Sequence, residues 1–166
     1  RGGADIVSFC IGQPDFPTPV HVQDAAVAAI RAGRHGYTPS AGIDELREAA
    51  ATSMGALRGI EISADEVVVG AGAKPFIGYT IASVTDYGAG DEVIFPVPGF
   101  PIYESQIIAN GAVPVPLPLR EARGFAFDPA ELAARIGPKT RLLILNSPHN
   151  PTGGILDRPA LDAIAD

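Results

Sequence analysis

The sequence predicts an α/β fold with a mostly parallel sheet and helices on both of its faces. Two short runs, residues 92–95 and 141–146, are apolar without alternation, which is typical of strands buried on both sides. Helical patterns separate these runs, and the 19 glycines and 16 prolines gather where elements are expected to end. In such sheets ligands bind at the carboxyl ends of the strands. We therefore expect functional residues in the loops that follow them.

The first half of the chain predicts three helices and one strand. Small and apolar residues keep a helical spacing over residues 20–32 and again over 43–57, with Gly33 and Gly59 as stop signals. Residues 66–69, Glu-Val-Val-Val, form a β-branched run suited to a buried strand. A glycine-rich segment follows, and then an apolar helical stretch to about residue 84.

The remaining chain alternates strands with helices. The run at residues 112–117 is strand-like, but its two prolines favour a position at the edge of the sheet. Asp128 is a plausible N-cap for the helix that follows it. The expected helices cover residues 102–109, 129–136 and, as one that has only begun, 158–166.

Composition excludes several classes of function. The chain has 166 residues, enough for one domain of ordinary size, and a formal net charge of −7 without a basic stripe, so a nucleic-acid partner is not expected. No apolar run is long enough for a transmembrane helix, so no membrane partner is expected. Cys10 is the single cysteine and the three histidines lack metal-ligand spacing, so no disulfide and no metal site are expected. A lone cysteine favours a cytoplasmic location.

The glycine-rich segment at residues 70–74, Gly-Ala-Gly-Ala-Lys, could bind a phosphate. Small residues allow close approach of the backbone, and free N–H groups at the start of a helix suit an anion. It lacks the Gly-Lys-Ser/Thr of a Walker A loop and the third glycine of a dinucleotide fingerprint. Taken alone, it is equally consistent with a tight turn.

The segment at residues 146–154, Asn-Ser-Pro-His-Asn-Pro-Thr-Gly-Gly, is more specific because it places Asn150 between two prolines after a buried strand. It resembles the Asn-Pro-Thr-Gly signature of class I/II aminotransferases, the fold-type I enzymes that use pyridoxal 5'-phosphate (PLP). Four further segments resemble that family in the same order along the chain: residues 12–19, 37–47, 72–74 and 98–103.

The resemblance implies a role for each matching residue. Asn150 would donate to the phenolic oxygen of PLP, Phe100 would stack on its ring, and both would also border the substrate. The backbone at Gly72, Ala73 and Lys74 would hold the phosphate. Tyr37 would reach the phosphate of the other subunit in a homodimer, and Gly12 would meet the substrate carboxylate. The competing interpretations are a turn residue for Asn150, a core phenylalanine for Phe100, a solvated side chain for Lys74, a loop tyrosine for Tyr37 and a strand-ending turn for Gly12.

The family's Schiff-base lysine is not expected within this sequence. Only Lys74 and Lys139 are available, and neither lies in the Ser-x-x-Lys context of the family. The lysine should lie beyond Asp166, so we assign no catalytic residue and expect the chain alone to be inactive. The resemblance thus implies an incomplete PLP-dependent transferase large domain at residues 41–166, preceded at residues 1–40 by an N-terminal segment that includes a small-domain or interface arm.

Two geometric expectations accompany the resemblance. The peptide bond between Asn150 and Pro151 should be cis, and that between Val97 and Pro98 is a second candidate. The segments at residues 67–70 and 142–146 should belong to one sheet without pairing directly.

The resemblance implies transfer of an amino group between an amino acid and a 2-oxo acid through PLP. A carbon–sulfur lyase or an aminocyclopropane-carboxylate synthase of the same fold stays open, as does a non-catalytic ligand-sensing domain. A nucleotide-binding Rossmann domain is disfavoured by the missing third glycine.

Overall fold

The computed structural model describes residues 12–165, and the chain divides into two compact units, Arg1–Val67 and Val68–Asp166. The expected division near residue 40 separates an arm from a cofactor domain, and it stays a prediction. Each unit is described by itself below.

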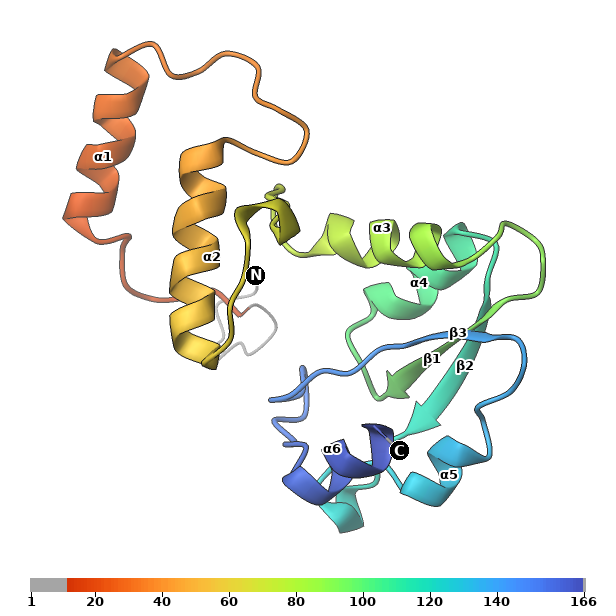
Figure 1. Ribbon diagram of the computed structural model, residues 1–166. Helices are drawn as coiled ribbons and strands as arrows, with labels where there is room; N and C mark the ends of the chain where they lie inside the picture. Colours follow the sequence, from red (N-terminus) through yellow and green to blue (C-terminus); the bar gives the residue numbers. More distant parts are fainter. Residues whose placement is uncertain (1–11, 166) are drawn as a thin grey trace, which may run out of the picture. The chain divides into compact units, whose positions relative to one another are not determined.

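The described part of the first unit, residues 12–67, forms two α-helices and a short 3-10 helix (Figure 1). Gly59 ends the second helix in the left-handed conformation, with φ of 67°, as its predicted stop role requires. Both helices start and end within one residue of the predicted positions. Their bounds are α1 Val20–Arg31, α2 Asp44–Arg58 and η1 Ala64–Glu66.

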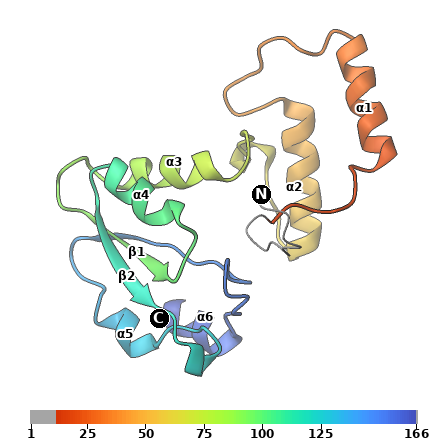
Figure 2. The same ribbon diagram turned by 180° about the vertical axis from the view of Figure 1, so that it is seen from behind.

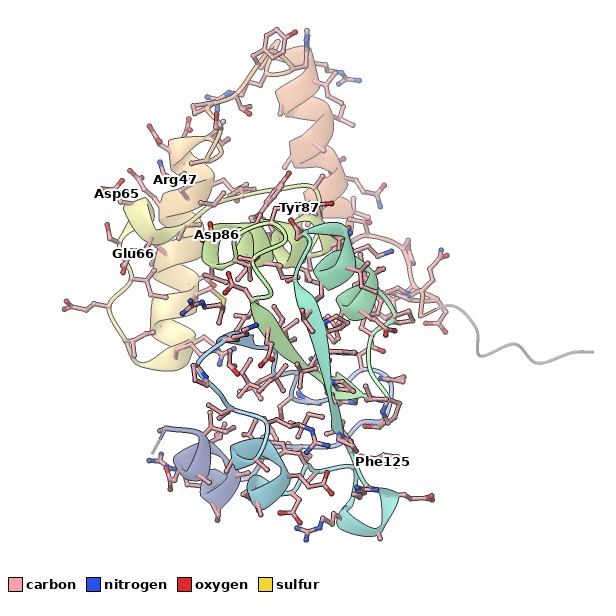
Figure 3. The ribbon with its side chains drawn as sticks, turned by 90° about the vertical axis from the view of Figure 1, so that its right-hand side faces the viewer. Arg47, Asp65, Glu66, Asp86, Tyr87 and Phe125 are labelled. Atoms are coloured by element: carbon pink, nitrogen blue, oxygen red, sulfur yellow. The ribbon has the colours of Figure 1, made fainter. Side chains whose placement is uncertain are left out.

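Arg47 of α2 ties this helix to the η1 segment, as the side-chain view shows (Figure 3). Its Nε donates a 3.0 Å hydrogen bond to the carbonyl oxygen of Val67. Its guanidinium lies 3.2 Å from a carboxylate oxygen of Asp44 and 3.4 Å from one of Asp65. The Arg47 side chain is only 15% exposed, whereas Asp44 and Asp65 are 77% and 95% exposed, so the hydrogen bond to the Val67 carbonyl is the contact that holds the end of η1 against α2.

The second unit is a three-layer α/β arrangement, which confirms the predicted fold class. Its three strands are all parallel in the order β2-β1-β3, so the proline-containing strand β2 lies at an edge as predicted. Helices α3 and α4 cover one face of the sheet, and α5 and α6 cover the other (Figures 1 and 2). The bounds are α3 Lys74–Val84, β1 Glu92–Val97, α4 Ile102–Ala109, β2 Val113–Pro118, η2 Glu121–Arg123, α5 Pro129–Ala133, β3 Thr140–Leu143 and α6 Arg158–Ala165.

Two hydrophobic cores lie on opposite faces of the central strand β1. Val93 and Phe95 point into the core beneath α3 and α4, whereas Ile94 points into the core beneath α5 and α6. Val93 and Ile94 have no exposed surface at all. Burial of each such side chain contributes about 1.5–3 kcal/mol relative to exposure. The other buried members are Ile81, Tyr103, Ile107 and Ala112 in the first core and Leu117, Phe127 and Leu132 in the second.

The predicted strand at residues 66–69 is wrong. Val67, Val68 and Val69 belong to no strand, and Val68 is 57% exposed. The β-branched run has the propensity for a strand, but no described segment supplies the ladder of hydrogen bonds that a strand needs. It therefore does not pair with β3, which agrees with the expected lack of direct pairing. The segment was also expected to belong to the same sheet as β3, but the sheet contains only β2, β1 and β3 among the described residues.

Two other elements are shorter than predicted. Helix α5 ends at Ala133 instead of residue 136, because the chain tightens there into turns before Pro138, which disfavours a helical residue in front of it. Strand β3 ends at Leu143 instead of Asn146. One more hydrogen bond follows, from the amide of Ile144 to the carbonyl of Ile94, before the chain turns away.

A buried carboxylate fastens the amino ends of the strands. Asp91 is 7% exposed, and its side chain accepts hydrogen bonds from the Asp86 amide at 2.9 Å and from Arg141 Nε at 3.0 Å. The Asp86 amide, and after it the Arg141 guanidinium, lower the pKa of the Asp91 carboxyl below its ordinary value of 3.8.

We predict that Asp91→Asn lowers the free energy of unfolding at pH 7 and removes an acid-dependent part of stability. A depressed folded-state pKa contributes stability that is present above pH 3.8 and is lost as pH falls through the lower folded-state value. Urea unfolding of the protein should therefore show the difference between wild type and variant shrinking below pH 3.8. The control is Glu104→Gln, an exposed carboxylate of α4. A wild-type-like pH dependence in Asp91→Asn would contradict this role.

Candidate functional site

One pocket of about 540 Å³ lies at the carboxyl ends of β1 and β3. Its walls come from the start of α3, from the loop after β1 and from the turn after β3. Five of the residues singled out from the sequence line it together: Gly72, Ala73, Lys74, Phe100 and Asn150. Ala71, Ile77, Tyr103 and Asn146 complete the lining.

The start of α3 presents backbone donors to this pocket. Gly72 has a φ of 83°, a conformation that favours glycine and turns the chain into the helix. The amides of Ala73 and Lys74 have no backbone acceptor among the described residues, as expected at the start of a helix. Pro75 follows and has no N–H group. Ala73 and Lys74 therefore supply the free amides, where the helix dipole favours an anion.

The loop after β1 supplies an aromatic wall. The Phe100 ring packs edge to face on Tyr103 with their centroids 5.9 Å apart, and Lys74 Nζ lies 5.8 Å from the Phe100 centroid. The peptide bond between Val97 and Pro98 is cis, as predicted. A side chain at Gly99 would place its Cβ only 2.2 Å from the carbonyl oxygen of Pro96. The path of the chain into Phe100 therefore depends on glycine.

The turn after β3 places Asn150 beside the pocket, and a second asparagine holds it. Asn146 Oδ1 accepts a 2.8 Å hydrogen bond from the Asn150 amide, and Asn146 Nδ2 donates to the Pro148 carbonyl at 3.2 Å. The bond between Asn150 and Pro151 is cis, as predicted, and so is that between Ser147 and Pro148. The role of Asn146 was not expected, although an asparagine that closes a buried strand was its visible signal.

His149 is a second residue that the sequence did not single out. It is 6% exposed, and its Nδ1 lies 2.8 Å from Thr152 Oγ1. Its Nε2 is buried and has no hydrogen-bond partner among the described residues. Burial lowers the pKa of the His149 imidazole below its ordinary value of 6.5, so the ring is neutral at pH 7. A histidine between two prolines in a signature turn was the only hint in the sequence.

The other predicted residues are not among those that line this pocket. Gly12 and Tyr37 belong to the first unit and are exposed, and their roles stay predictions. The Lys139 carbonyl accepts a 2.8 Å hydrogen bond from the amide of Glu92, the first residue of β1, so Lys139 lies at the amino end of the sheet. Among residues 12–165 there is no cluster of side chains that could hold a metal ion, and none of the helices there could cross a membrane.

The pocket fits a cofactor with a phosphate, a flat ring and a ring oxygen. The free amides of Ala73 and Lys74 suit the phosphate, the Phe100 ring suits an aromatic face, and the Asn150 side chain suits an oxygen. The volume lies within the range of about 300–1,000 Å³ usual for such sites. PLP has these three parts.

Known proteins resemble this chain over nearly its whole length. Residues 4–166 match the family described as aminotransferase class I and II. The chain is 42% identical over 162 residues to the aspartate aminotransferase of Pyrococcus horikoshii, covering 98% of this chain and 41% of that protein. It is 38% identical over 164 residues to a probable aspartate/prephenate aminotransferase of Aquifex aeolicus, covering 99% and 41%.

Solved structures agree with the sequences. A mutant of Thermus thermophilus aspartate aminotransferase superposes with a TM-score of 0.92 at 36% identity, covering 98% of this chain and 42% of that one. An aromatic aminotransferase of Pyrococcus horikoshii superposes with a TM-score of 0.91 at 38% identity, covering 98% and 43%. The chain thus spans about two fifths of the length of these relatives.

We predict that Gly99→Ala costs about 1–3 kcal/mol of stability, as overpacking usually does, because the new Cβ meets a backbone oxygen that cannot move aside easily. Gly137→Ala is the matched control, since a Cβ there meets nothing within 4 Å. Its effect should stay within about 0.5 kcal/mol. Urea unfolding of both variants measures the difference. Equal stabilities would show that the turn after β1 adapts freely.

We also predict a loss of stability below pH 6.5 that depends on His149. Its folded-state pKa is lowered, so the unfolded chain binds the proton more readily than the folded chain does. The free energy of unfolding should be constant above pH 6.5 and fall as pH drops from 6.5 toward the lower folded-state value. In His149→Phe this decline should be absent. Thermal unfolding between pH 5 and 8 would reveal it, and parallel curves would contradict it.

Proposed function

Because the chain belongs to the aminotransferase class I and II family, we propose that it forms the cofactor-binding part of an aminotransferase. The enzyme would transfer an amino group between an amino acid and a 2-oxo acid with PLP. The observation that supports this proposal is a single pocket at the strand ends. It combines free amides at the start of a helix, an aromatic ring and an amide side chain.

Each wall of the pocket has a separate task in this proposal. The Ala73 and Lys74 amides bind the phosphate, and the Lys74 ammonium adds positive charge near it. Phe100 would stack on the pyridine ring, and Asn150 would donate to the phenolic oxygen. When bound, PLP supplies the electron sink that makes the bonds at the substrate's α-carbon labile. The residues of this chain would hold PLP in one orientation in the pocket.

The chain's two lysines do not provide the covalent attachment point. Lys139 lies at the amino end of the sheet, and Lys74 lies at the phosphate end of the pocket. Neither is placed to move a proton at the substrate's α-carbon. We propose that a lysine elsewhere in the full-length polypeptide does this, and that residues 12–165 alone would not catalyse transamination.

Three further parts of the proposal rest on the family alone or on weaker signals. We propose a homodimer in which Tyr37 reaches the phosphate of the partner subunit. Gly12 would offer its backbone to the substrate carboxylate. A cytoplasmic location is proposed from the single cysteine, Cys10.

We predict that Asn150→Ala in the full-length enzyme lowers kcat/KM by about tenfold to a hundredfold, the range expected when a hydrogen bond to a charged group is lost. The absorption band of bound PLP should also change its pH midpoint, because its phenolic oxygen loses a donor. Asn110→Ala is the control, since Asn110 caps α4 by donating to the Gln106 carbonyl and does not line this pocket. An unchanged spectrum and turnover in Asn150→Ala would remove Asn150 from the site.

A further inference from the structure

The neighbours His149 and Asn150 face opposite sides of the sheet. Asn150 lines the pocket shared with Phe100 and Ile77, on the side covered by α3. His149 lines a small, partly open cavity of about 20 Å³ with Leu117 and other members of the second core. The turn after β3 therefore crosses the carboxyl edge of the sheet between these two residues.

The segment from His149 to Gly154 is closed on itself by hydrogen bonds. The His149 amide donates to the Gly154 carbonyl at 2.7 Å, and the Gly153 amide donates to the His149 carbonyl at 2.7 Å. Inside this ring, Thr152 Oγ1 lies 2.8 Å from His149 Nδ1 and accepts from the Gly154 amide at 3.3 Å. Among the described residues, Thr152 is thus the only one whose side chain links His149, at the start of the ring, to Gly154, at its end.

The ring also packs against the backbone at Gly124 and Phe125, which follow η2. A Cβ on Gly154 would lie 3.0 Å from the carbonyl oxygens of Gly124 and Phe125, so the backbones touch there without room for a side chain. The Leu156 amide donates to Ser147 Oγ at 2.9 Å, which closes the turn on its outer side. Asn150 is part of this hydrogen-bonded ring and also lines the pocket.

The environment of the imidazole favours a neutral ring. The other residues that line this cavity are apolar except for Asn146, and none of them is titratable. A neutral imidazole carries one N–H group. With the proton on Nδ1, the imidazole donates a hydrogen bond to Thr152 Oγ1. Nε2 is then an unpaired acceptor, which costs less than an unpaired N–H group at the same buried position.

We propose that the His149–Thr152 pair is a positioning device that holds Asn150 in register with the cofactor pocket. This inference rests on the proposed function, in which Asn150 contacts the phenolic oxygen of PLP. The Asn146 side chain holds the Asn150 amide, and the His149–Thr152 pair joins the residue before Asn150 to the residue after Pro151. If either the Asn146 hydrogen bond or the His149–Thr152 pair is lost, the Asn150 amide can still form hydrogen bonds, but its side chain is no longer held in the orientation that PLP requires.

The test uses the full-length enzyme with PLP and three variants of the device. Thr152→Val keeps the shape and removes the hydroxyl, Thr152→Ser keeps the hydroxyl, and His149→Phe keeps a ring in the cavity and removes Nδ1. Two quantities are measured: the dissociation constant of PLP and the pH midpoint of the absorption band of bound PLP. The melting temperature without PLP records stability separately.

Thr152→Val and His149→Phe should weaken PLP binding about threefold to tenfold, the worth of one hydrogen bond. Both should move the spectroscopic midpoint in the direction seen for Asn150→Ala, whereas Thr152→Ser should stay near the wild type. A lower melting temperature with an unmoved midpoint would overturn the proposal and leave only a stabilising turn. Equal effects of the Val and Ser substitutions would overturn it too.

The Asn150→Ala arm separates this inference from the proposed function. If Asn150→Ala moves the midpoint and Thr152→Val and His149→Phe do not, the positioning device is wrong and the proposed function stands. If Asn150→Ala itself leaves the midpoint unmoved, the proposed contact falls and the device falls with it. Either folded variant of the pair is enough to decide between these outcomes.

Discussion

The alternation of side chains along β1 is the constraint on which the rest of the second unit depends. Val93 and Phe95 enter one core and Ile94 the other, so a single strand fastens α3 and α4 to one face and α5 and α6 to the opposite face. A shift of one residue would exchange these faces and expose both cores at once. The buried Asp91 carboxylate resists such a shift because it lies directly before β1 and accepts hydrogen bonds from the Asp86 amide and from Arg141.

The site lies where the central strand β1 and the edge strand β3 end, β3 beside Ile94 and β1 three residues further on at Val97. Beyond Val97 and Leu143 the ladder no longer dictates the path of the chain, and two turns take over. Each turn is tethered to a different core, the first through Phe100 and Tyr103 and the second through His149. The pocket is therefore framed by loops whose positions are set by packing on both faces of the sheet.

The sequence predicted the elements whose signals are local. The helix stop at Gly59, the Asp128 cap, the edge position of β2 and the pocket residues Phe100 and Asn150 all followed from short patterns or from family motifs. The strand at residues 66–69 failed because pairing is non-local, and propensity cannot supply a neighbour. Asn146 and His149 were missed for a related reason. Their partners are backbone groups and Thr152 in a turn whose closure no periodicity describes.

An acidic chain with a net charge of −7 can still offer an anion site, because the field at the pocket is local. The carboxylates of the second unit that form ion pairs do so with arginines away from the pocket lining, as in the pairs Asp91–Arg141 and Glu131–Arg120. The start of α3 brings the positive end of an eleven-residue helix to the pocket, and Lys74 adds a cation there. Since Pro75 has no N–H group, the Ala73 and Lys74 amides would supply the directional hydrogen bonds to the phosphate in the proposed function. Charge at this site is thus set by where one helix begins, and the composition of the whole chain has little influence on it.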